Sequence, residues 1–225
     1  MNINSMSNIS VKIKKYRESL PNEVCLIAVS KTKPNEDILE AYHAGQRIFG
    51  ENKIQEMTDK YEALPKDIEW HMIGHVQTNK VKYMAPYVSL VHAVHKMKLL
   101  KEIEKRAKEE NRVIECLLQI KIAEEDSKYG MEADEALKIL NSEAYQQMEH
   151  VKIVGLMGMA TLTEDKQKIT SEFAYLKEKM DEFSKDFPQL TALSMGMSGD
   201  YQLAIDNGSN MVRIGSSIFG KRNYN

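Results

Sequence analysis

The sequence has few cysteines and little imbalance of charge, and each shortage narrows what the protein can be. Its 225 residues include two cysteines, Cys25 and Cys116, each inside a β-favouring run and without the spacing of metal ligands. We therefore predict two reduced core thiols in a cytoplasmic protein. A net charge of −2 supplies no basic field for a polyanion, so the composition argues against nucleic acid as a partner.

Long apolar segments are also missing. The longest apolar run, Ile153–Ala160, is far shorter than the ~20 residues that span a bilayer. Residues 1–8 lack the basic and apolar regions of a secretory signal, so we expect no membrane association. There is no Gly-x-Ser-x-Gly elbow and no linker rich in proline, glycine or serine. We therefore expect a single domain over residues 1–225.

What the sequence does contain is a regular alternation of two periodicities. Runs of β-favouring residues alternate with segments whose apolar residues recur every three or four positions, the spacing of a helix face. The predicted strands are 25–31, 47–52, 69–74, 88–94, 113–122, 151–160, 192–198 and 210–214. The predicted helices are 7–20 before the first strand and then 35–44, a segment ending near 64, a turn to 84, 96–110, 132–140, 166–187 and 200–206.

The number of these units predicts the fold class. Eight βα units in roughly 200 residues is the repeat of a closed (β/α)8 barrel. The alternative is an open doubly wound sheet, which usually has fewer strands and a glycine-rich phosphate loop after the first of them. Here the first strand ends in a lysine instead. We predict an α/β protein, a single (β/α)8 TIM-type barrel with an extra N-terminal helix.

That lysine, Lys31, follows the apolar run Leu26–Val29. A buried strand would deliver Lys31 to the edge of the core, where scarce water lowers the pKa of an amine and frees it to attack a carbonyl carbon. This is the condition for a Schiff base. The alternative is that Lys31 and Lys33 simply begin a solvated loop. Lys33 is the weaker candidate, because Pro34 forces it to be extended.

Two later loops have the composition of an anion site. In barrels of this type, phosphate is frequently held by the loops after the seventh and eighth strands. Here the first of those loops contains Ser198, and the second contains Gly215 and Ser216. Small residues allow close approach to backbone N–H groups, and hydroxyls can donate to a phosphate. Each loop alone also fits an ordinary turn, but together they indicate a ligand site.

Arg213 is predicted to point into the barrel, because side chains alternate between the two faces of a strand. A guanidinium there needs an acceptor, which is either a ligand atom or an internal carboxylate such as Glu51. The sequence favours neither. His71 on the third predicted strand has two interpretations as well, a ligand contact or a core histidine whose hydrogen bonds are satisfied within the protein.

Five motifs, taken in order over nearly the whole chain, resemble the pyridoxal phosphate homeostasis protein family. They are Ala28–Lys31, Phe49–Asn52, Trp70–Lys80, Ser194–Ser198 and Val212–Gly215. The resemblance implies the fold of the barrel domain of alanine racemase, with pyridoxal 5′-phosphate (PLP) bound as an internal aldimine. It also implies a role in keeping the cellular level of this cofactor balanced, without a firmly established reaction.

The resemblance also implies which residues bind the cofactor. They are Lys31 as the Schiff-base lysine, Arg213 facing the pyridine nitrogen, Ser198, Gly215 and Ser216 at the phosphate, and Asn52 and His71 around the ring. One departure lies in the segment 121–130, where Lys121 stands at a position that is often asparagine in the family. Any role of this loop is then in doubt, although Ser127, Lys128 and Gly130 fit the pattern.

The expected function is cofactor storage and delivery rather than catalysis. Alanine racemase uses a second, β-rich domain and a tyrosine from a partner subunit, whereas this sequence ends at Asn225 soon after the eighth predicted strand. An arginine at the ring nitrogen opposes protonation there and weakens the electron sink of carbanion chemistry. We expect a monomer that passes PLP to apo PLP-dependent enzymes. The alternative is a weak amino-acid racemase-like enzyme.

Overall fold

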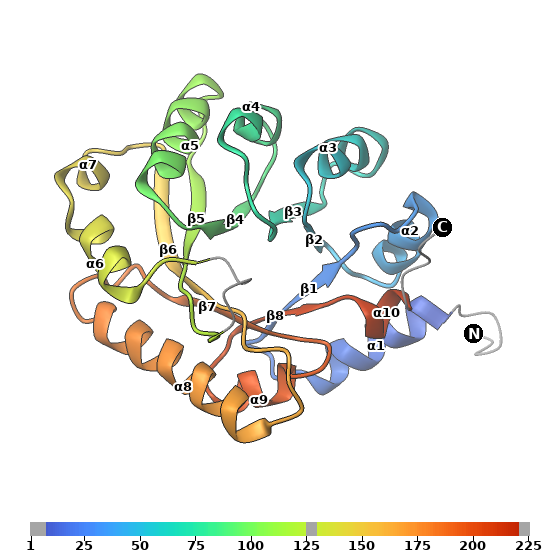
Figure 1. Ribbon diagram of the computed structural model, residues 1–225. Coiled ribbons are helices and arrows are strands. Elements are labelled where there is room, and N and C mark those ends of the chain that lie inside the picture. Colours follow the sequence, from blue (N-terminus) through green and yellow to red (C-terminus); the bar gives the residue numbers. More distant parts are fainter. Residues whose placement is uncertain (1–7, 125–129, 221–225) are drawn as a thin grey trace.

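The computed structural model describes residues 8–124 and 130–220, which form a closed barrel of eight parallel strands (Figure 1). The strands pair in chain order and β8 closes on β1, so the predicted α/β barrel is confirmed. The strands are β1 (Cys25–Val29), β2 (Ile48–Glu51), β3 (Glu69–Met72), β4 (Leu90–Val94), β5 (Ile114–Gln119), β6 (Val151–Met157), β7 (Ala192–Met197) and β8 (Met211–Ile214).

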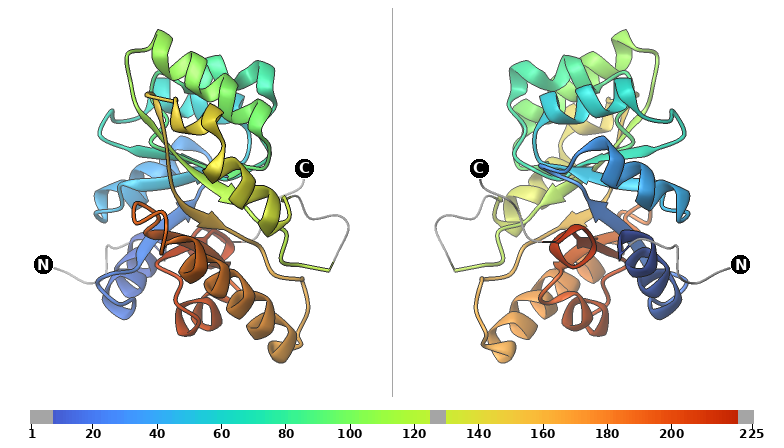
Figure 2. Two further views of the ribbon diagram at one scale, coloured as in Figure 1. Left: turned by 90° about the vertical axis from the view of Figure 1, so that its left-hand side faces the viewer. Right: turned by 90° about the vertical axis from the view of Figure 1, so that its right-hand side faces the viewer.

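The helices surround the barrel wall, as the side views also show (Figure 2). They are α1 (Asn8–Ser19), α2 (Asn35–His43), α3 (Ile54–Ala63), α4 (Val81–Met84), α5 (Met97–Glu109), α6 (Ala133–Asn141), α7 (Glu143–Gln146), α8 (Lys166–Phe183), α9 (Tyr201–Asp206) and α10 (Ser216–Phe219), with a 3-10 turn, η2 (Thr78–Lys80), before α4. The short helix α7 was not predicted, because a single turn carries no periodic apolar face.

The main core lies between the barrel wall and the helices. Helix α8 shows how the sequence builds it: Phe173 and Leu176 are fully buried, and they belong to an apolar stripe at helical spacing. The helix begins where the side chain of Asp165 accepts hydrogen bonds from the backbone N–H groups of Gln167 and Lys168. Burial of this stripe against the strands stabilises the barrel from outside.

A smaller apolar cluster fills the inner face of β4 to β7. Its buried members are Leu90, Ala93, Leu117, Val154, Met157 and Ala192. The strands are shorter at their carboxyl ends than predicted, since β1 ends at Val29 and β7 at Met197. The predicted site residues Lys31 and Ser198 therefore lie in loops just beyond the strands, above this inner cluster.

The extra N-terminal helix is confirmed as α1, which packs against α2 and α10. Ser10 donates a backbone hydrogen bond to the Glu40 carboxylate at 3.3 Å, and the Lys12 ammonium donates to the Ile218 carbonyl at 3.4 Å. These contacts connect the start of the chain to the segment after β8. Helix α1 therefore braces α10, whose first residue is Ser216.

Both cysteines are free thiols, as expected. Burial raises the pKa of Cys25 to about 11 and raises the pKa of Cys116 further. Among residues 8–124 and 130–220, no group of three or more His, Cys, Asp and Glu side chains could hold a metal ion. None of the helices in these same ranges combines the length and apolarity needed to cross a bilayer.

Candidate functional site

A cavity of about 710 Å³ opens at the carboxyl ends of the strands. This is the end of a (β/α)8 barrel where functional groups gather. The cavity is lined by Val29, Lys31, Lys33, Asn52, Lys53, Ile73, Gly74, His75, Gln119, Met159, Leu162, Met197, Ser198, Gly199, Arg213, Gly215, Ser216 and Gly220. All of the residues expected around the ligand are in this lining except His71.

Lys31 reaches the cavity from a tight turn that follows β1. The turn runs from Ser30 to Lys33 and is closed by a hydrogen bond of 3.0 Å from the Lys33 N–H to the Ser30 carbonyl. Lys31 begins the loop after β1, as the solvated-loop alternative had it, but it is partly buried and lines the cavity. Lys33 also lines the cavity, and its ammonium donates to the Phe219 carbonyl at 2.9 Å, at the end of α10.

Arg213 is buried in the inner face of β8, with 4% of its surface exposed. Its guanidinium donates to the Ser194 hydroxyl at 2.5 Å and to the Gly158 carbonyl at 3.0 Å. The alternative of an ion pair with Glu51 is wrong, because Glu51 lies on the opposite face of β2 and pairs with Lys60. Burial lowers the pKa of Arg213 to about 10, so the group stays cationic at neutral pH.

His71 lies below the cavity rather than in its lining. Its Nδ1 is 3.0 Å from Nε2 of His92, and Nδ1 of His92 is 2.9 Å from the Ser194 hydroxyl, which also accepts from Arg213. Burial lowers the pKa of His71 to about 3 and holds that of His92 well below 6.5, so both rings are neutral. His71 begins a chain of hydrogen bonds that ends at Arg213 in the lining, and its place around the ring stays a prediction.

The two predicted anion loops meet on one side of the cavity. The Gly215 N–H donates to the Ser198 hydroxyl at 3.2 Å, which connects the loop after β7 to the loop after β8. Ser216 is exposed at the first turn of α10. A Cβ atom at Gly215 would lie 3.2 Å from the Val29 carbonyl, tighter than ordinary packing. Glycine here lets β8 approach β1 beside the cavity.

Asn52 and Gly74 close the cavity on the side of β2 and β3. A Cβ atom at Gly74 would lie 2.4 Å from the Asn52 carbonyl, so only glycine lets these two backbones approach so closely. Asn52 thereby has a defined position in the lining. Sequence reasoning missed Lys53, His75 and Gln119, which line the same cavity. The signal that could have found them is their position at or just after strand ends.

The charged side chains that line the cavity are all cationic in the described part of the chain. The described lining includes Lys31, Lys33, Lys53 and Arg213 and no aspartate or glutamate. A concave site with one sign of charge concentrates ligands of the opposite sign. Hydroxyls and backbone N–H groups at one wall suit a phosphate, and an amine at the mouth can condense with an aldehyde. The arrangement fits a small phosphorylated carbonyl compound.

The remaining segment singled out by the sequence is 121–130. Lys121 is described, and its backbone N–H donates to the Met131 carbonyl at 2.9 Å, next to a bridge between Ile120 and Met131. The expectations for Ser127 and Lys128 concern residues outside the described ranges. The lining of the cavity, within the part of the chain that is described, reaches Gln119 but not Lys121.

Known proteins similar to this chain define the broad family to which it belongs. Residues 5–223 match the family described as alanine racemase, N-terminal domain. Structures of PipY from Synechococcus elongatus PCC7942 have been solved without PLP (35% identity, TM-score 0.89) and with PLP bound (34% identity, TM-score 0.86). Each alignment covers 94% of this chain and 100% of PipY. The chain therefore belongs to the alanine racemase N-terminal domain family.

Curated relatives define the family more narrowly. The pyridoxal phosphate homeostasis protein of Aquifex aeolicus is 40% identical over 201 residues, which are 88% of this chain and 87% of the relative. That of Vibrio alginolyticus is 38% identical over 209 residues, 91% of this chain and 89% of the relative. This chain belongs to the pyridoxal phosphate homeostasis protein family, as its motifs indicated.

The likeness to alanine racemases concerns the fold. The racemase of E. faecalis is 17% identical with a TM-score of 0.71, and the alignment covers 96% of this chain but 58% of the racemase. At this level of identity the comparison says nothing about a shared reaction.

Proposed function

We propose that this protein binds PLP as a Schiff base on Lys31 and stores or delivers the cofactor within the cell, without robust catalytic activity of its own. The observation that carries the proposal is that Lys31 and Arg213 face one cation-lined cavity. The membership of the chain in the pyridoxal phosphate homeostasis family supports the same ligand. When bound, PLP supplies an aldehyde that exchanges reversibly between amines.

Each part of the proposed site has its own task. The Lys31 amine would hold the aldehyde carbon of PLP covalently, with release of one water molecule. Ser198, Gly215 and Ser216 hold the phosphate through two hydroxyls and a backbone N–H, while Asn52 contacts the ring. Arg213, which lines the cavity, would face the pyridine nitrogen. The fit rests on the donor set that the lining presents, which matches a phosphate at one wall and a carbonyl at the other.

The charge of Arg213 supports a carrier rather than an enzyme. A cationic guanidinium at the ring nitrogen keeps a proton off that atom, and the ring then accepts electrons poorly when a bond to the amino-acid α-carbon must break. Arg213 is held in this role by Ser194 and Gly158 and is buried, so it cannot turn away easily. Exchange of the aldehyde from Lys31 to another amine needs no such electron withdrawal.

The proposal predicts that the protein transfers PLP to other enzymes but does not itself convert amino acids. Purified protein loaded with PLP is expected to activate an apo PLP-dependent enzyme in mixing experiments, while showing at most trace racemase or transaminase activity on the common amino acids. The same apo-enzyme mixed with a cofactor-free sample is the control. A kcat of about 1 s⁻¹ or more on a defined amino acid, within the ordinary range of enzymes, would favour the racemase-like alternative.

The phosphate contacts predict the effect of a double substitution. Ser198→Ala with Ser216→Ala removes two donors to a charged group, each worth about 1.5–3 kcal/mol. Affinity for PLP in equilibrium dialysis is expected to fall by about 100-fold or more. Ser217→Ala is the matched control, because Ser217 is next in sequence and is outside the described lining. Unchanged affinity in the double variant would place the phosphate elsewhere.

A further inference from the structure

The turn that carries Lys31 has an unfavourable backbone conformation. Thr32 is the third residue of the turn, and its φ is +62°. This left-handed region favours glycine or asparagine, and a β-branched residue is rarely found there. A conformation of this kind persists only where surrounding contacts enforce it. The residues that enforce it are therefore part of how Lys31 is presented.

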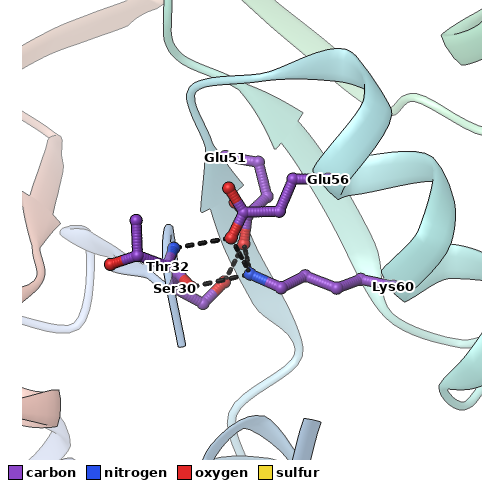
Figure 3. A network of polar contacts seen from close by, with 5 residues as sticks. All are labelled: Ser30, Thr32, Glu51, Glu56 and Lys60. Atoms are coloured by element: carbon purple, nitrogen blue, oxygen red, sulfur yellow. Dashed lines mark hydrogen bonds and ion pairs between the residues drawn. The ribbon is translucent and has the colours of Figure 1, made fainter. Parts of the chain in front are cut away.

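Those contacts come from β2 and α3 and meet at one ammonium group (Figure 3). Lys60 donates to the Ser30 carbonyl at 2.8 Å and to the carboxylates of Glu51 and Glu56, both at 2.7 Å. The three acceptors match the three protons of an ammonium group. Glu56 also accepts from the Thr32 N–H at 2.5 Å, and Glu51 accepts from the Ser30 hydroxyl at 2.6 Å.

The network therefore contacts the turn on both sides of Lys31. Ser30 is held through its carbonyl and its hydroxyl, and Thr32 through its backbone N–H. The hydroxyl of Ser30 bonds to Glu51 and its carbonyl to Lys60, both on the side of the helix layer, whereas Lys31 lines the cavity. Fixing Ser30 outside the barrel wall thus fixes the direction of Lys31 inside it.

The network is a poor source of stability, which argues that positioning is its role. Glu51 is fully buried, Lys60 is 5% exposed, and Oε2 of Glu51 has no hydrogen-bond partner in the described structure. Burial raises the pKa of Glu51 to about 6 despite the opposing effect of Lys60. Removing such charges from water costs much of what their attraction returns. An apolar pair would fill the same space, but it could not hold the turn.

We infer that Glu51, Glu56 and Lys60 form a clamp that holds the Ser30–Lys33 turn in its left-handed conformation and so aims Lys31 into the cavity. These are positioning residues, because none of them lines the cavity. The inference deepens the proposed function and rests on it for the role of Lys31. The existence of the clamp itself can be tested in the cofactor-free protein.

The decisive variant is Lys60→Met, which keeps the length of the side chain and removes the ammonium. In the cofactor-free protein, hydrogen exchange at the Thr32 and Lys33 amides is expected to become about tenfold faster or more. On mixing with PLP, the rate of Schiff-base formation is expected to fall about tenfold, because the amine is no longer held in the reactive direction. Affinity for pyridoxine 5′-phosphate, which has the ring and phosphate but no aldehyde, should stay unchanged.

Two further variants separate positioning from damage to the fold. Lys66→Met alters an exposed lysine just beyond α3 and should behave as the wild type in all three measurements. Thr32→Gly should be tolerated, because glycine adopts a φ of +62° without strain. Combined with Lys60→Met, Thr32→Gly should restore most of the lost rate of Schiff-base formation, because the turn then adopts its conformation without help from Lys60.

The outcomes decide the inference. The inference would be overturned if Lys60→Met formed the Schiff base and exchanged its Thr32 and Lys33 amides as fast as the wild type does. It would also be overturned if Lys60→Met lost affinity for pyridoxine 5′-phosphate as strongly as it lost the rate, because that would indicate general damage to the fold. Failure of Thr32→Gly to restore the rate would also contradict it. If the wild-type protein forms no Schiff base with PLP, the proposed function fails instead, and amide exchange in the cofactor-free variants then decides whether the clamp exists.

Discussion

Lys31→Ala is expected to abolish the visible absorbance of the PLP-loaded protein. The absorbance arises from the Schiff base, and the covalent link requires the Lys31 amine at the cavity mouth. Non-covalent binding through the phosphate contacts should persist at lower affinity, so the expected result is loss of colour with some retention of cofactor. Absorbance spectra before and after dialysis, combined with borohydride reduction and peptide mapping, provide the measurement.

Lys33→Ala is the matched control for this experiment. Lys33 is two residues away and lines the same cavity, yet its ammonium is hydrogen-bonded to the Phe219 carbonyl at 2.9 Å. The Lys33→Ala protein is therefore expected to keep the visible band, with the reduced adduct on Lys31. The assignment is wrong if Lys31→Ala retains the full band while Lys33→Ala loses it.

Acid is expected to destabilise the protein steeply because of the histidine pair beneath the cavity. Burial lowers the pKa of His71 to about 3 and that of His92 well below 6.5. As pH falls below about 6.5, the unfolded chain binds two protons that the folded chain does not. The stability that the pair contributes is fully present above that pH and is lost toward the folded-state values. The expected loss is about 1.4 kcal/mol per pH unit for each histidine.

Urea unfolding at several pH values measures this effect. We expect the dependence of the unfolding free energy on pH, between about pH 6 and pH 5, to become shallower by about half in His71→Gln and by more in the double variant with His92→Gln. His43→Gln, at an exposed position on α2, is the control for loss of a histidine outside the buried pair. Equal slopes in the wild type and the double variant would contradict neutral burial of the pair.

The sequence was sufficient for the architecture because the architecture depends on periodicity. Apolar spacing along segments such as 166–187 predicted helices, and α8 lies where this spacing placed a helix. Strand ends were less certain, because β-favouring composition continues past the last ladder hydrogen bond. Lys31 was assigned to the first strand, yet it belongs to a turn whose left-handed Thr32 has no sequence signature.

The sequence predicted which side chains point into the barrel, but not how far along the barrel axis each one lies. Alternation along a strand gives the face of a side chain, and Arg213 does point into the barrel. It does not give the level along the barrel axis, so it could not foresee that His71 contacts His92 and is absent from the cavity lining. The partner of Glu51 was also beyond prediction, because Lys60 comes from α3 and reaches β2 only when the helix packs on the barrel wall.

The environment of the two thiols bears on how the proposed site would hold a reactive aldehyde, because Cys116 is buried and Cys25 is partly buried. An aldehyde also adds to sulfur, and an ionised thiol is the stronger competitor for it. Cys25 begins β1, at the end of the barrel away from the cavity, and Cys116 lies within the wall of β5. Burial keeps each protonated at neutral pH. Under the proposed function, neither thiol would compete strongly with Lys31 for the aldehyde, so selectivity for one amine would depend partly on where the barrel wall places its cysteines.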